Sequence, residues 1–100
     1  MKKKKWTILS NHGRMLAYVA EHPQVTTQSM AEKAGLSIRA VQTILNDLEE
    51  EGYIGRERIG RCNRYQVNPE RPLRHRMEGH RSVGGMLLAL GVKVREKGMV

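Results

Sequence analysis

Arginine side chains gather in the stretch from Tyr53 to Arg76, where seven arginines stand against only two acidic residues. A guanidinium group is planar and always charged, and its fork of N–H donors matches the oxygens of a phosphate or the O6 and N7 atoms of guanine. The stretch from Arg14 to Glu51 has the opposite balance, with three basic and six acidic residues. The basic chemistry is therefore localised. A merely solvated basic face is the alternative interpretation, and the surrounding elements must decide between the two.

Composition limits what kind of protein carries these arginines. The 100 residues have a net charge of +8 and a hydrophobic content of 39%, which fits a single small domain with one core. Cys62 is the one cysteine, so the sequence offers no internal disulfide. The apolar residues after the lysine run Lys2 to Lys5 are too few for a signal peptide, and the apolar run Met86 to Leu90 is too short for a membrane span. We therefore expect a cytoplasmic protein without a membrane segment.

Three helices are expected in the first half of the chain, each with a recognisable start. Ser10, Thr26 or Thr27, and Ser37 can act as N-caps, and apolar residues follow them at spacings of three and four. The first helix should end at His22-Pro23 and the second at Gly35. The third should continue to the acidic run Glu49 to Glu51 and bury one face, whose apolar stripe consists of Ile38, Val41, Ile44, Leu45 and Leu48.

After Gly52 the periodicity changes from helix to strand. Tyr53-Ile54 and Tyr65-Gln66-Val67 read as the two strands of a β-hairpin, with residues 59–63 as its loop. The prolines of Asn68-Pro69 and Arg71-Pro72 predict a linker. A last helix is expected from an N-cap at Ser82, with a short apolar stripe formed by Val83, Met86, Leu87 and Leu90.

The segment from Thr27 to Ile44 resembles the helix-turn-helix of bacterial and archaeal regulators; its sequence is TQSMAEKAGLSIRAVQTI. The small residue Ala31 stands where the two helices approach most closely, and Gly35 stands in the turn. Leu36, Val41 and Ile44 take the buried positions. With the helix before it and the hairpin after it, the resemblance extends from Ser10 to Val67 and is to winged helix-turn-helix regulators of the MarR and ArsR type. It implies a mainly α fold with a small β-hairpin.

The resemblance also implies a face for reading DNA. On the third helix, the side opposite the apolar stripe and the N-terminal end would enter the major groove, while the hairpin arginines would contact phosphates or the minor groove as a wing. Arginine can pair with guanine, and Gln or Asn with adenine. The predicted DNA-binding residues are Ser37, Arg39, Ala40, Gln42, Thr43 and Asn46 on the helix, and Arg58, Arg61 and Arg64 on the hairpin.

The sequence therefore divides into a basic N-terminal arm (1–9), a winged helix-turn-helix domain (10–68), a linker (69–81), and a dimerisation helix with a tail (82–100). The last stripe is short and contains glycines, so we expect it to pack against a second copy in a homodimer. The expected function is a non-enzymatic transcriptional regulator that binds a palindromic double-stranded DNA operator. The alternative is a winged-helix interaction module that binds a protein partner or RNA.

Other chemistry finds little support in the sequence. The four histidines lack the spacing of metal ligands, and no nucleophile stands with an obvious base, so we expect no metal, no cofactor and no catalytic site. Cys62 lies between Arg61 and Arg64, which leaves oxidant sensing open as a minor alternative. No residue pattern identifies a small-molecule effector.

Overall fold

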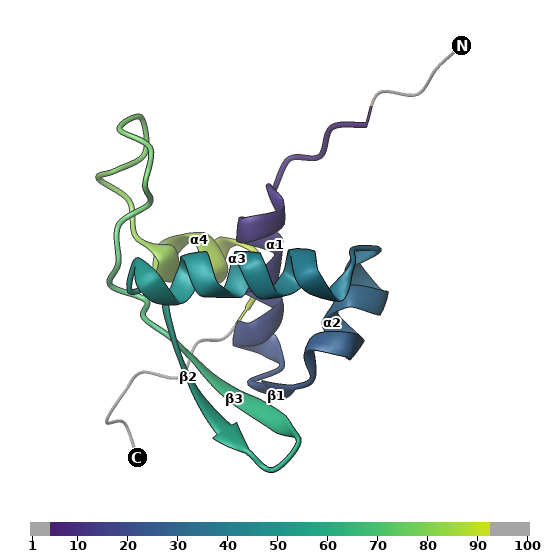
Figure 1. The fold of residues 1–100 in the computed structure, drawn as a ribbon. Helices are drawn as coiled ribbons and strands as arrows, with labels where there is room; N and C mark the ends of the chain where they lie inside the picture. The colour runs from purple at the N-terminus through teal and green to yellow at the C-terminus, as the bar shows by residue number, and fades with distance from the viewer. Residues whose placement is uncertain (1–4, 93–100) are drawn as a thin grey trace.

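The fold is a winged helix-turn-helix, as the sequence predicts, seen here in a computed structural model that describes residues 5–92 (Figure 1). Lys2 to Lys4 of the basic arm and residues 93–100 of the expected tail lie outside the described residues. Within residues 5–92, no helix has the length and apolar character needed to cross a membrane. The elements are α1 (Asn11–Glu21), β1 (Gln24–Val25), α2 (Thr27–Ala34), α3 (Ile38–Glu50), β2 (Ile54–Ile59), β3 (Cys62–Val67) and α4 (Val83–Ala89).

Every helix begins at the hydroxyl residue that the sequence predicts. The capping side chain accepts a hydrogen bond from a backbone N–H of the first turn, which otherwise has no partner inside the helix. The second helix ends at Gly35, whose φ of 69° is the left-handed conformation that a residue with a side chain adopts only at a cost. The N-caps and the amides they accept from are Ser10 and Gly13, Thr26 and Ser29, Ser37 and Ala40, and Ser82 and Gly85.

The sheet has three antiparallel strands in the order β1-β3-β2. It therefore has one strand more than the β-hairpin that the sequence predicts. The additional strand, β1, is only two residues long and pairs with the half of β3 nearest the turn, through Gln24 with Arg64 and Val25 with Asn63. The backbone N–H of Tyr65 also donates to the carbonyl oxygen of Pro23 at 2.6 Å. Two residues are too few to show the alternating pattern of a strand in the sequence. The strand forms only through its pairing with β3.

The hairpin turn is tighter than predicted. Residues 59–63 were expected to form a loop, but Ile59 pairs with Cys62, and only Gly60 and Arg61 remain in the turn. Gly60 has a φ of 59° and Arg61 has a negative φ, which fits a type II′ turn with glycine in its first central position. The prediction of a five-residue loop was therefore wrong, and the strands extend further toward the tip of the wing.

The last helix packs on its own chain. Val83 and Leu87 are fully buried in the core that α1, α3 and the sheet form. Gly84 permits this packing, since a Cβ atom there would lie 3.0 Å from the carbonyl oxygen of Pro69. Two of the four residues in the predicted dimerisation stripe are thus covered within one chain, so the stripe does not need a second copy to cover them.

The segment before α4 is folded against the domain. The hydroxyl of Tyr53 donates to the carbonyl oxygen of Pro72 at 2.6 Å, and Pro72 forms an isolated antiparallel bridge with Ser82. The backbone N–H of Leu73 donates to the carbonyl oxygen of Arg81 at 3.0 Å. These bonds close residues 73–81 into a loop that starts and ends beside the core.

Candidate nucleic-acid interface

The exposed side of α3 carries the polar residues that the sequence assigns to base reading. Arg39, Gln42, Thr43 and Asn46 are all exposed, and Ala40 is half-buried. The other side of the helix is buried in the core through Val41, Ile44, Leu45 and Leu48. The apolar stripe thus fixes which side of α3 faces outward, with the exception of Ile38, which is 44% exposed and not part of the core.

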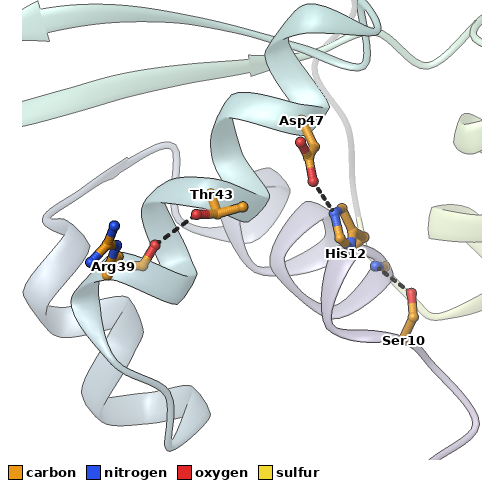
Figure 2. Close-up of polar contacts among 6 residues, drawn as sticks. Ser10, His12, Arg39, Thr43 and Asp47 are labelled. Carbon is orange, nitrogen blue, oxygen red and sulfur yellow. Dashed lines mark hydrogen bonds and ion pairs between the residues drawn. The ribbon is translucent and has the colours of Figure 1, made fainter.

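Two of these helix residues use part of their hydrogen-bonding capacity inside the chain. The Oγ atom of Ser37 accepts from the backbone N–H of Ala40 at 3.0 Å, so the oxygen is engaged as the cap and the hydroxyl hydrogen remains to donate. The Oγ1 atom of Thr43 donates to the carbonyl oxygen of Arg39 at 3.1 Å (Figure 2). The hydroxyl hydrogen of Thr43 is therefore engaged, which leaves its methyl group and an acceptor lone pair for a ligand.

The three predicted wing arginines lie at different places on the hairpin. Cross-strand partners point to the same face, so Arg58, opposite Asn63, and Arg64, opposite Glu57, lie on opposite faces of the sheet. Arg58 Nε donates to the carbonyl oxygen of Gly60 at 2.8 Å, across the turn. Arg64 Nη1 lies 3.9 Å from Glu57 Oε1. Arg61 is exposed in the turn itself, so the structure distributes the three charges around the tip.

A fourth hairpin arginine, Arg56, was not among the predicted site residues. It shares the core-facing side of the hairpin with Ile54 and with its cross-strand partner Tyr65, both of which are buried. Its guanidinium reaches α3, where Nε donates to Glu49 Oε1 at 3.0 Å and Nη2 donates to Asn46 Oδ1. The alternation of the strand could have placed Arg56 on the same side as Ile54, but only the folded chain brings it to Asn46.

Two of the three acidic side chains on α3, those of Asp47 and Glu49, bond side chains on other elements. Glu49 pairs with Arg56, and Asp47 Oδ2 lies 2.8 Å from Nε2 of His12 on α1 (Figure 2). Arg71 Nε donates to the carbonyl oxygen of Glu51 at 2.9 Å, beside the end of the helix. The guanidinium groups of Arg56 and Arg71 lower the cost of bringing the acidic end of α3 close to a polyanion, because opposite charges offset part of the repulsion.

The part of the chain that the structure describes contains no cluster of metal-ligating side chains. No group of three or more His, Cys, Asp or Glu side chains lies close enough together there to hold a metal ion. Cys62 is half-buried next to the turn, and no disulfide partner exists in the sequence.

The comparisons with known proteins agree with this geometry. Residues 9–54 match a family model described as winged helix-turn-helix DNA-binding. The match runs from the residue before the Ser10 cap to the first residue of β2, so it contains α1, α2 and the whole of α3. A search of curated proteins and a search of solved structures found no match. The family match supports a DNA-binding regulator.

Proposed function

We propose that this chain is a sequence-specific transcriptional regulator that binds double-stranded DNA in the cytoplasm as a homodimer, with one α3 in the major groove of each half of a palindromic operator. One observation carries the proposal. The exposed polar side of α3 lies beside an arginine-bearing hairpin, within a domain whose helices α1 to α3 match the winged helix-turn-helix DNA-binding model. The proposal involves no catalysis and no cofactor.

The residues of α3 would divide the base reading by their chemistry. Arg39 suits guanine, because its guanidinium can donate to O6 and N7 together. Gln42 is exposed and has both a donor and an acceptor, so it suits adenine N7 and N6. The methyl group of Thr43 suits the methyl group of thymine, since the hydroxyl hydrogen is bound to the helix backbone. Ser37 and Ala40 would lie nearest the duplex at the N-terminal end of the helix.

The wing arginines would contribute charge rather than sequence reading. Arg61, in the turn, reaches furthest along the hairpin and suits a phosphate or the minor groove, with Arg58 and Arg64 beside it on the two faces. The lysines at the start of the chain add to the positive field that attracts a polyanion. The same proposal includes a relationship of this chain to regulators of the MarR and ArsR type.

The homodimer part of the proposal rests on exposed apolar residues. Leu88 is 75% exposed and Leu90 47% exposed on or beside α4, while Trp6 and Ile8 are exposed before α1. A second copy would cover such side chains, and two-fold symmetry would match a palindromic operator. Because Val83 and Leu87 are already covered, Leu88 and Leu90 are the better candidates for contact between copies.

The experiment that tests the function is a selection of bound sequences from a pool of random duplexes, followed by shift assays on the enriched sequence. We expect one enriched palindromic motif, tighter binding to that duplex than to the same sequence as RNA, and dimers in sedimentation at micromolar concentration. Equal binding to duplex DNA of any sequence, or a preference for RNA, would contradict the proposal and favour the interaction module.

A further inference from the structure

We infer that Arg56 fixes the orientation of the Asn46 side-chain amide, so that Asn46 reads hydrogen-bond acceptors on the DNA and does not pair with adenine. The inference rests on the proposed function, in which α3 enters the major groove. It concerns a positioning residue on the wing and a specificity residue on the recognition helix. The role of Arg56 does not follow from the helix-turn-helix pattern, because Arg56 lies on β2, outside the helices.

The chemistry of the contact leaves one orientation for the amide. A guanidinium carries only donors, so the atom of Asn46 that faces it must be the acceptor Oδ1. Arg56 Nη2 donates to that oxygen, while Arg56 Nε donates to Glu49 Oε1 at 3.0 Å. The amide nitrogen of Asn46, with its two N–H donors, is then turned away from the arginine.

The surroundings hold the arginine in place. Its side chain is only 22% exposed, whereas that of Arg64 on the other face of the sheet is 56% exposed. It emerges from β2 opposite the buried Tyr65 and is bound at two atoms by one helix. A charge-assisted pair of this kind is stronger than a neutral hydrogen bond and specifies direction as well as distance.

The orientation decides which base edges Asn46 can read. Pairing with adenine requires the amide oxygen to accept from the N6 amino group while the amide nitrogen donates to N7. In this chain, that oxygen is already bound to a cation that lies beside it, and a base amino group would meet the guanidinium N–H groups there. The free donors instead fit guanine O6 and N7, thymine O4 or a phosphate oxygen.

The test uses the full chain, a pool of random duplexes and four proteins: the natural sequence, Asn46→Ala, Arg56→Met and Arg64→Met. Asn46→Ala identifies the base position that Asn46 reads, because the preference there is lost. Arg56→Met keeps the apolar stem but releases the amide. Arg64→Met removes the same charge from the adjacent strand without touching Asn46, so it is the matched control for charge.

At the position that Asn46 reads, we expect guanine or thymine for the natural chain and a relative gain of adenine of at least about fivefold for Arg56→Met. Arg64→Met removes a proposed wing contact, so it should weaken binding to all sequences but leave the base preference at that position unchanged. Amide spectra of the free protein add a readout without DNA, in which Arg56→Met should shift the side-chain amide resonances of Asn46 and Arg64→Met should not.

Three outcomes would overturn the inference. The first is an adenine preference at that position in the natural chain, and the second is the same base profile for both arginine variants. The third is an Asn46 amide resonance that Arg56→Met does not move. A natural chain that enriches no sequence at all would instead overturn the proposed function, and with it any reading by Asn46, so the two failures can be told apart.

Discussion

His12 and Asp47 join the first helix to the recognition helix, with Nε2 of the histidine 2.8 Å from Oδ2 of the aspartate (Figure 2). A carboxylate oxygen accepts, so Nε2 of the histidine is the donor in this bond. Both side chains are about half exposed. The bond therefore ties α3 to α1 at the solvent-facing margin of their contact, on the same helix that carries the proposed base-reading residues.

Loss of this bond should have a small but measurable effect on stability. We expect His12→Ala to lower the free energy of unfolding by up to about 1 kcal/mol, since exposed ion pairs contribute little. Asp47→Asn should cost less than Asp47→Ala, because the amide oxygen can still accept from Nε2. Denaturant unfolding of the single variants and of His12→Ala with Asp47→Ala measures the coupling, and fully additive losses would show that the two residues do not stabilise each other.

Arg39 and Arg61 should differ in what they contribute to DNA binding. Arg39→Ala should weaken binding to the selected duplex by roughly 1 to 3 kcal/mol per half-site and relax the sequence preference, because it removes base contacts. Arg61→Ala should weaken specific and non-specific binding alike and reduce the slope of log affinity against log salt by about 1 per contact. Salt titrations on selected and unrelated duplexes distinguish them, and identical behaviour would argue against base reading by α3.

Substitutions at Gly35 measure the cost of the left-handed backbone conformation without a steric clash. Its φ is 69°, and a Cβ atom there would meet nothing within 4 Å. Gly35→Ala should therefore cost about 1 to 2 kcal/mol of folding free energy through backbone conformation alone. Gly35→Asn should cost less, because asparagine tolerates the left-handed conformation. Equal thermal unfolding curves for the two variants would contradict this account.

Substitutions at the neighbouring residues Leu87 and Leu88 should distinguish an effect on folding from an effect on dimer formation. Leu87 is fully buried, so Leu87→Ala should lower the free energy of unfolding by about 2 to 5 kcal/mol. Leu88 is 75% exposed, and Leu88→Ala should leave the folding of each chain nearly unchanged. If Leu88 contacts a second copy, Leu88→Asp should convert dimers to monomers in sedimentation. A dimer that persists would show that the interface between copies does not include Leu88.

Chelation tests the expectation that no metal is needed. We expect a chelator to leave the affinity for the selected duplex unchanged, because the four histidines and Cys62 show no ligand spacing in the sequence. Shift assays before and after dialysis against chelator measure this. Loss of binding that zinc restores would reveal a site that sequence reasoning missed.

Local signals made much of the fold predictable. The caps at Ser10, Ser37 and Ser82, and the left-handed Gly35, depend on residues within a few positions of one another, so the sequence contains what fixes them. The exposed side of α3 follows from its apolar stripe in the same way. Candidate residues such as Arg39 could therefore be chosen from the sequence, although their contacts with DNA stay a prediction.

Features that depend on distant residues were not predictable. The strand β1 exists only because Val25 and Gln24 meet β3, some 40 residues later. The bond between Arg56 and Asn46 joins a strand to a helix, and neither residue has a local pattern that favours the other. Of the stripe predicted for α4, Val83 and Leu87 are buried but Leu90 is 47% exposed. Periodicity predicts that a face is buried and says nothing of which surface covers it.

The pairing of β1 with β3 has a mechanical consequence for the wing. β1 leads directly into the Thr26 cap of α2 and is bonded to β3 at Asn63 and Arg64, close to the Gly60 turn (Figure 1). The half of β3 nearest the turn is thus bonded to the segment that leads into α2. We therefore expect the span between α3 and Arg61 to vary little. A duplex that is to meet both must supply a groove of matching width, so stiff and pliable sequences would differ in affinity even at base pairs that no side chain touches.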